Sequence, residues 1–267
     1  ARRAGLVAKK RFGQNFLVDR GVLQLIVDAL HPTADDDVLE IGPGVGTLTG
    51  ALAARARRVV AVDVDERCVA ATRQTQTLNA NVTVVHGDAL RVDPVALGMG
   101  DGWLAAGNIP YSITTPLLTT LFEMDRPPRR GVFLVQREVA ARLAASSGDW
   151  SLATVAVRSV ADVERLADVP PDSFDPPPAV HSSVVRLTAA RVLDPAARQG
   201  VLDLARFAFQ MRRKTLRHGI THAAGGDEAA ALWWLAEAGI DAGRRPGTLS
   251  VEEWQRIAAA ATLRPQQ

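Results

Sequence analysis

The chain has 267 residues, of which 47% are hydrophobic, and it carries one cysteine and a formal net charge of +2. This length allows one large domain and a smaller one, with enough apolar residues for a buried core. No apolar run approaches the roughly 20 residues that a membrane span needs, and the first ten residues lack the apolar core of a signal peptide. The single cysteine excludes an internal disulfide framework, so we expect a cytoplasmic protein.

The basic residues are almost all arginines, and they form clusters at 1–11, 126–130, 212–217 and 244–245. The planar guanidinium group suits phosphate recognition. A genome rich in arginine codons would produce similar clusters without any such role. The charge pattern therefore leaves a nucleic-acid partner open and does not establish one.

Short apolar runs alternate with helical patterns through the first 145 residues. Each run is bounded by Gly, Asp or Asn, which is typical of buried parallel strands. Such alternation predicts an α/β fold with a Rossmann-like, mostly parallel sheet. The expected strands are residues 38–41, 59–62, 82–85, 104–107 and 132–135, and the expected helices are 22–30, 46–56, 67–78, 115–123 and 137–145.

The pattern changes in the second half of the chain. Residues 154–160 and 183–188, joined through a proline-rich connection, are expected to close one edge of the sheet as an antiparallel pair. From about residue 194 the periodicity is helical, over 197–213, 228–238 and 251–261. We therefore expect a first domain over 1–190 and a small all-α domain over 191–267.

The first expected strand leads into glycines at every second position, Gly42, Gly44 and Gly46. This spacing lets the backbone turn tightly and approach a ligand. Asp63 ends the next strand, where it can bind ribose hydroxyls, and Asp88 follows the third, where it can accept a bond from an adenine amino group. Each acid taken alone is equally typical of a turn. Together they predict a nucleoside pocket, and the lack of a phosphate-loop lysine favours S-adenosylmethionine over a nucleoside triphosphate.

The fourth strand ends in Asn108-Ile-Pro-Tyr111, beside the expected pocket. The amide oxygen of Asn108 and a backbone carbonyl of this loop can accept from an exocyclic adenine amine, while Pro110 restricts the loop. The ring of Tyr111 can stack on the base, so the ring should matter more than its hydroxyl. Phe174 is a candidate for a second stacking wall or for a core residue beneath a loop.

Four segments together resemble the rRNA adenine N6-dimethyltransferases. They are Arg11-Phe-Gly-Gln-Asn-Phe-Leu17, Glu40-Ile-Gly-Pro-Gly-Val-Gly46, Asn108-Ile-Pro-Tyr111 and Phe174-Asp-Pro-Pro-Pro-Ala-Val-His-Ser182. The resemblance implies that Asn15 and Leu17 touch the cofactor and that Phe174 stacks on the base. It also implies that Asn108, Pro110 and Tyr111 belong to the catalytic loop. Ala179 departs from a frequent lysine, and Trp150-Ser151 from a usual Tyr-Gly pair.

The resemblance implies dimethylation of adenosine N6 in rRNA, but two kinds of enzyme share this family. Ile109 is more similar to the macrolide-resistance methylases of large-subunit (23S) rRNA. Residues 212–216 and 248–254 resemble the helical domain of the small-subunit enzymes, and phosphate contacts there would select the substrate. We therefore expect two adjacent adenosines near the 3′ end of small-subunit (16S) rRNA to be the target, within an immature subunit. The expected RNA contacts are Arg212, Arg213, Lys214 and Arg217.

Other functions remain as alternatives. A ribosome-assembly factor could act mainly by binding, whereas a DNA adenine methylase or a small-molecule methyltransferase fits the loop and the arginine-rich helices less well. His218 and His222 are spaced as metal ligands on a helix could be, but no third ligand is near them in the sequence. We expect no metal, no membrane partner and a monomer.

Overall fold

The computed structural model describes residues 14–146, 148–190 and 193–263. Contacts divide the chain into two compact units, one comprising Ala1–Ala140 and Val163–Ala189 and the other Ala141–Asp162 and Ala190–Gln267. One boundary of these units falls between Ala189 and Ala190, one residue before the division expected from the sequence. Residues 141–162, however, group with the C-terminal helices and not with the first domain. The reason is apolar packing: Trp150 and Val155 belong to the same hydrophobic cluster as Trp254.

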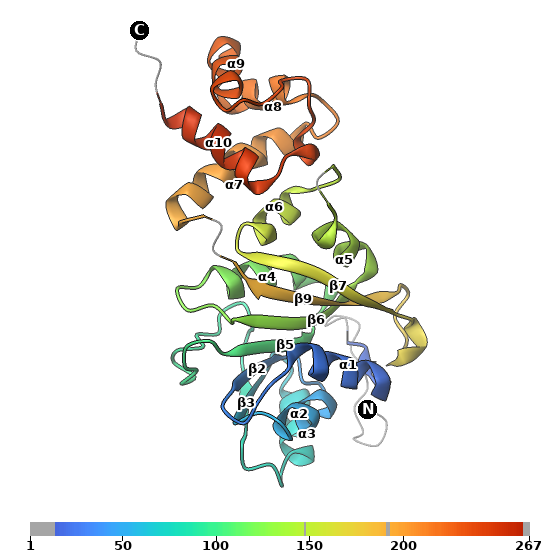
Figure 1. Cartoon of the computed structure of the whole chain (residues 1–267). Helices are drawn as coiled ribbons and strands as arrows, with labels where there is room; N and C mark the ends of the chain where they lie inside the picture. The colour runs from blue at the N-terminus through green and yellow to red at the C-terminus, as the bar shows by residue number, and fades with distance from the viewer. Residues whose placement is uncertain (1–13, 147, 191–192, 264–267) are drawn as a thin grey trace. The chain divides into compact units, whose positions relative to one another are not determined.

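A seven-stranded sheet forms the first unit, in the order β4-β3-β2-β5-β6-β9-β7 (Figure 1). The five strands from β4 to β6 pair in parallel, and β9 pairs antiparallel with β6. This confirms the mostly parallel sheet and its first five strands. The strands are β2 (Asp37–Ile41), β3 (Arg58–Asp63), β4 (Val82–His86), β5 (Leu104–Asn108), β6 (Arg130–Gln136), β7 (Ala161–Val169) and β9 (Ser182–Ala189), and a separate antiparallel pair joins β1 (Phe16–Leu17) to β8 (Phe174–Asp175).

Alternate residues of the central strands point at one helical layer. Val38, Leu104 and Val132 are fully buried in one cluster with Ile26 and Leu30 of the first helix. This alternation follows from the period of two in a strand. The helices of this unit match the expected ones: α1 (Arg20–Leu30), α2 (Thr47–Ala53), α3 (Glu66–Thr75), α4 (Thr114–Glu123) and α5 (Arg137–Ala144), which crosses into the second unit.

The expected strand over 154–160 is wrong, because α6 (Leu152–Arg158) occupies this segment. Ser151 begins the helix: its Oγ accepts from the Thr154 N–H at 3.3 Å, and its own N–H donates to Thr154 Oγ1 at 3.2 Å. This capping box outweighs the β-branched residues that suggested a strand. The edge strand is instead β7, immediately after the helix.

The second unit packs its helices around Trp254, which is fully buried. The three expected helices are confirmed, and α8 was not foreseen. A Cβ at Gly219 of α8 would lie 2.8 Å from Ala208 Cα, so glycine permits close packing of α7 and α8. None of the described helices is long and apolar enough to cross a membrane. The helices are α7 (Pro195–Gln210), α8 (Leu216–Ala223), α9 (Glu228–Glu237) and α10 (Val251–Thr262).

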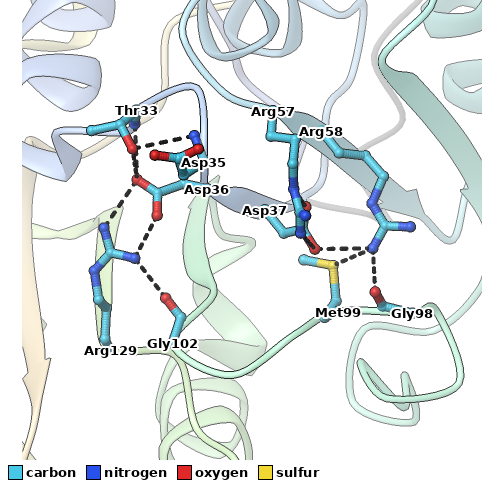
Figure 2. Close-up of polar contacts among 10 residues, drawn as sticks. All are labelled: Thr33, Asp35, Asp36, Asp37, Arg57, Arg58, Gly98, Met99, Gly102 and Arg129. Carbon is cyan, nitrogen blue, oxygen red and sulfur yellow. Dashed lines mark hydrogen bonds and ion pairs between the residues drawn. The ribbon is translucent and has the colours of Figure 1, made fainter.

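Ion pairs secure the edge of the sheet at which the parallel strands begin (Figure 2). Arg129, just before β6, donates from Nη1 and Nη2 to the two carboxylate oxygens of Asp36 at 2.6 and 3.0 Å. Asp37 pairs with Arg57 and Arg58 at 2.9 and 3.3 Å. Arg129, which belongs to the arginine cluster at 126–130, is therefore engaged in a structural ion pair. The opposite edge is left for a ligand.

Replacement Asp36→Asn should lower the free energy of unfolding at neutral pH by about 1–3 kcal/mol, because it removes a charge-assisted, bidentate contact. The Arg129 guanidinium holds the pKa of Asp36 at about 2, below its ordinary value of 3.8. The stabilisation is thus present above pH 3.8 and is lost as the pH falls through about 2. Urea unfolding between pH 7 and pH 2 should show the difference between variant and parent shrinking. Asp35→Asn removes an adjacent, exposed carboxylate and should have little effect at any pH; equal losses in the two variants would contradict this account.

Candidate functional site

A cavity of about 350 Å³ opens at the carboxyl ends of β2, β3, β4 and β5. Ligands of open α/β sheets bind at this edge, and the volume is in the range of small-molecule sites. The expected glycines, acids and catalytic loop therefore lie together. The lining residues are Gln14, Asn15, Phe16, Ile41, Gly42, Gly44, Val62, Asp63, Val64, Cys68, Gly87, Asp88, Ala89, Leu90, Asn108, Ile109, Pro110, Tyr111, Ser112 and Ile113.

The glycine loop forms one wall of the cavity. Gly42 and Gly44 have φ angles of 70° and 61°, which side-chain-bearing residues rarely adopt. A Cβ at Gly44 would also lie 2.8 Å from Cδ1 of Phe16. Only glycine therefore lets the backbone line the cavity at this point.

One face of α3 holds this loop by three hydrogen bonds. Thr72 Oγ1 donates to the Gly44 carbonyl at 3.1 Å, and Gln76 Nε2 donates to the Gly46 carbonyl at 2.8 Å. Between them, Thr75 Oγ1 donates to the Val45 carbonyl at 3.0 Å. Residues three and four apart share a helix face, so α3 satisfies three successive carbonyls. Sequence reasoning missed these residues, although the spacing Thr-x-x-Thr-Gln was visible.

The two acids occupy different environments. Asp63 is 8% exposed, and burial raises the pKa of its carboxyl group, while the N–H groups of Asp65 and Gly44 lower it. Asp88 is exposed, and its Oδ1 accepts from the Leu90 N–H at 3.0 Å as in a turn. Both line the cavity as expected. Asp88 also has the turn role that the sequence left open.

The side-chain amide of Asn108 is oriented by a long-range contact. Its Nδ2 donates to the backbone carbonyl of Asn15 at 2.7 Å, across 93 positions of sequence. A carbonyl at that distance requires the NH₂ group and not the amide oxygen, which fixes the assignment of the two atoms. Within the described residues no donor reaches Oδ1 of Asn108. The cavity therefore contains an amide oxygen that is both oriented and available.

The rest of the loop follows as a short 3-10 turn, η3 (Tyr111–Ile113). Pro110 precedes it with φ −54°, and its carbonyl accepts from the Ile113 N–H at 3.1 Å. The Tyr111 hydroxyl lies 2.8 Å from Oγ of Ser182. The loop is thus held at both ends, with the tyrosine ring at the cavity.

Two expected site residues lie elsewhere. Phe174 is 3% exposed, packs in the hydrophobic core and does not line the cavity. Its pairing with Leu17, in the register of β1 and β8, turns both side chains inward. The structure thus places Phe174 in the core, the second of the two environments considered from the sequence, and its stacking role stays a prediction. Leu17 lines an adjoining cavity of about 40 Å³, and residues 11–13 of the N-terminal segment lie outside the described residues.

That smaller cavity is also lined by Glu40, for which we predicted no role from its sequence position. Glu40 is 1% exposed, burial raises its pKa to about 8, and its Oε2 has no hydrogen-bond partner among the described residues. The sequence feature that could have identified Glu40 is an acidic residue within a predicted buried strand, next to the glycine loop. Cys68 lines the larger cavity, but burial raises the pKa of its thiol to about 12, which makes it a poor nucleophile.

The C-terminal cations differ in their surroundings. Arg217 forms an ion pair with Glu228. Arg212, Arg213 and Lys214 are exposed in the turn between α7 and α8, and no carboxylate of the described residues pairs with them. The turn ends the expected helix at Gln210, three residues earlier than the sequence suggested.

The two histidines of α8 have other partners. Thr215 Oγ1 lies 3.0 Å from Nδ1 of His218, and the His222 ring contacts Phe207 edge-on at 5.3 Å. Within the described part of the chain, no group of three or more His, Cys, Asp or Glu side chains could hold a metal ion.

The sheet order and the position of the cavity define a Rossmann-like protein with a ligand site at the carboxyl ends of its strands. The comparisons with known proteins narrow this class. The chain belongs to the ribosomal RNA adenine dimethylase family, whose model matches residues 5–262.

Relatives named ribosomal RNA small subunit methyltransferase A are similar over nearly the whole chain. The protein from Geobacter metallireducens is 42% identical over 265 residues, 96% of each chain. That from Dechloromonas aromatica is 40% identical over 258 residues, 95% of this chain and 98% of the relative.

Two solved structures resemble this one. A dimethyladenosine transferase from Plasmodium falciparum has a TM-score of 0.76 and 26% identity, with 91% of this chain and 95% of that chain covered. The 23S rRNA methyltransferase ErmE has a TM-score of 0.74 and 26% identity, with 93% of this chain and all of that chain covered. The fold is therefore shared with an enzyme named for 23S rRNA and with one named a dimethyladenosine transferase.

Replacement Thr72→Val should weaken binding of S-adenosylmethionine roughly two- to tenfold, because one hydrogen bond to the glycine loop is lost at nearly constant side-chain volume. Isothermal titration calorimetry measures this affinity directly. The matched control is Thr77→Val, since the Thr77 hydroxyl bonds only to carbonyls of Arg73 and Gln74. Unchanged affinity in Thr72→Val would show that the α3 contacts do not shape the cofactor site.

Proposed function

We propose that this protein transfers methyl groups from S-adenosylmethionine to N6 of two adjacent adenosines near the 3′ end of small-subunit rRNA. The product would be N6,N6-dimethyladenosine. The observation that carries the proposal is the oriented Oδ1 of Asn108, which no donor of the described residues reaches, at the edge of a nucleoside-sized cavity. Membership of the adenine dimethylase family and the names of the relatives support the class of substrate.

The residues around the cavity suit this cofactor. The backbone at Gly42 and Gly44 leaves room that a Cβ would fill, and Asp63 provides a buried carboxylate for ribose hydroxyls. Oε2 of Glu40, which has no hydrogen-bond partner in the described part of the chain, lies beside the glycine loop and suits a cationic group. A nearby cation would favour the ionised form of Glu40 and lower its raised pKa. When bound, S-adenosylmethionine supplies a methyl group on a positively charged sulfur.

The loop can make an adenine amine reactive by position alone. The lone pair of this amine is delocalised into the ring, so the nitrogen is a poor nucleophile. The two N–H groups of the amine can donate hydrogen bonds to Asn108 Oδ1 and to a backbone carbonyl of the loop. These two hydrogen bonds favour a pyramidal nitrogen, whose lone pair is turned towards the methyl donor. Tyr111 offers a ring for stacking, worth roughly 1–3 kcal/mol. No strong base is needed, because the N–H becomes acidic once the nitrogen is alkylated; orientation and electrostatics carry the rate.

Replacement Asn108→Asp tests whether the side chain needs both its NH₂ donor and its oxygen acceptor. An aspartate would bring a carboxylate oxygen towards the Asn15 carbonyl, where the parent has a donor at 2.7 Å. We expect Asn108→Asp and Asn108→Ala to lose most methyl transfer, roughly 100-fold or more in kcat, with cofactor affinity kept within about tenfold. Single-turnover transfer to rRNA, with calorimetry of cofactor binding, separates the two effects. Near-normal transfer by either variant would show that this amide does not act on the amine.

The cations of the turn after α7 are proposed to bind RNA phosphates. Arg212, Arg213 and Lys214 support this because they are exposed and have no acidic partner in the described chain, unlike Arg217. Replacing all three with Ala should weaken rRNA binding and reduce the log–log salt slope by up to about three. Arg217→Ala is the matched comparison and should change the slope by less than one. An unreduced slope in the triple variant would mean that the turn is only a solvated surface.

The proposal of small-subunit rRNA as the substrate rests on the names of the relatives and on residues 212–216 and 248–254. Ile109 alone favours large-subunit rRNA. We propose a monomer that acts in the cytoplasm on an immature subunit. The test offers labelled cofactor with small-subunit particles that lack the modification and, separately, with protein-free large-subunit rRNA. We expect labelled dimethyladenosine only in the small-subunit RNA, located by mass spectrometry of its fragments. Label confined to the large-subunit RNA would make the protein a resistance methylase, and binding without label would make it an assembly factor.

A further inference from the structure

Tyr111 is the single tyrosine of the chain, and its hydroxyl has a buried partner. The phenol oxygen lies 2.8 Å from Oγ of Ser182, which comes 71 positions later and is 1% exposed. Ser182 is the last residue of the segment that begins with Phe174.

The serine is itself rigidly mounted. Ser182 is the first residue of β9 and pairs with Gln136 of β6, and the preceding carbonyl, of His181, accepts from the Arg137 N–H at 3.0 Å. The next residue, Ser183, faces the other way, and its Oγ donates to Asp168 at 2.7 Å. The sheet thus holds one hydroxyl, from Ser182, against the tyrosine of the cavity.

A hydrogen bond to the Tyr111 hydroxyl restricts the direction of the side chain more than packing within a short turn does. Tyr111 lies in a single turn of 3-10 helix, and its side chain is only partly buried. A contact at the hydroxyl fixes the direction of the ring about χ1, and it leaves the ring face free for a ligand. A base could then stack with little loss of side-chain freedom.

We propose that Ser182 is a positioning residue that holds the Tyr111 side chain in the χ1 direction that places its ring beside the target adenine. This inference rests on the proposed function, in which Tyr111 is the stacking surface. It also changes an expectation from the sequence, because the tyrosine hydroxyl becomes important through its anchor and not only the ring. Tyr111→Phe should therefore resemble Ser182→Ala, both milder than Tyr111→Ala.

The single tyrosine provides a direct reporter. Growth with 3-fluorotyrosine places fluorine at residue 111 alone, so fluorine NMR of the full-length protein gives signals from that ring only. Loss of the anchor in Ser182→Ala should shift the signal and narrow it, because the ring becomes more mobile. Ser183→Ala is the matched control, since it removes a neighbouring buried hydroxyl that contacts Asp168 instead. An unchanged spectrum in Ser182→Ala, or the same change in both variants, would overturn the inference.

Kinetics test the consequence of the anchor. Ser182→Ala and Tyr111→Phe should each lower kcat/KM for rRNA roughly two- to tenfold, with cofactor affinity unchanged within about twofold. The double variant should be no worse than either single one, because both remove the same contact. Additive losses would overturn the inference.

Different results would contradict the stacking role of Tyr111 and the positioning role of Ser182. If Tyr111→Ala methylates rRNA at the parental rate, the stacking role in the proposed function is wrong, and the inference falls with it. If Tyr111→Ala is impaired and Ser182→Ala is not, only the inference is overturned.

Discussion

The hydrogen bond from Asn108 Nδ2 to the Asn15 carbonyl joins the end of β5 to the segment before β1. It uses the donor half of an amide and leaves the acceptor half facing a cavity. A free asparagine presents both halves equally, so a contact of this kind is what makes the residue directional. The remaining features of the site depend on it, because a base presented to an unoriented amide would not be held with its amine towards the cofactor.

The parallel sheet makes that contact possible. Parallel strands bring their carboxyl ends to a single edge, where the glycine loop, Asp63 and the catalytic loop meet. The opposite edge of the sheet is secured by the ion pairs of Asp36 and Asp37 (Figure 2). Support for the site comes from α3 and β9, through contacts to the glycine loop and to Tyr111. Neighbouring elements thus hold the glycine loop and Tyr111 in place at the cavity.

Much of this could be predicted from the sequence. Apolar runs bounded by Gly and Asp located the first five strands, and the glycine spacing located the cavity. The strand predicted over 154–160 was wrong because its β-branched residues suggested a strand, whereas the capping box at Ser151 favours a helix. The resemblance suggested a stacking role for Phe174, but its environment depends on the pairing of two short strands 157 positions apart, which a linear pattern does not show. The contacts of Asn15, Thr72 and Ser182 could not be predicted for the same reason, because each joins residues that are far apart in the sequence.

The most direct test of the account is a high-resolution crystal structure of the protein with S-adenosylhomocysteine. The account predicts the ribose at Asp63, the adenine near Asp88, and the Asn108 NH₂ group still bonded to the Asn15 carbonyl, with Oδ1 directed to the space beside the sulfur. A nucleoside bound elsewhere would contradict it. So would an Asn108 side chain turned so that Oδ1 no longer faces the cavity, since the proposed activation of the amine depends on that oxygen.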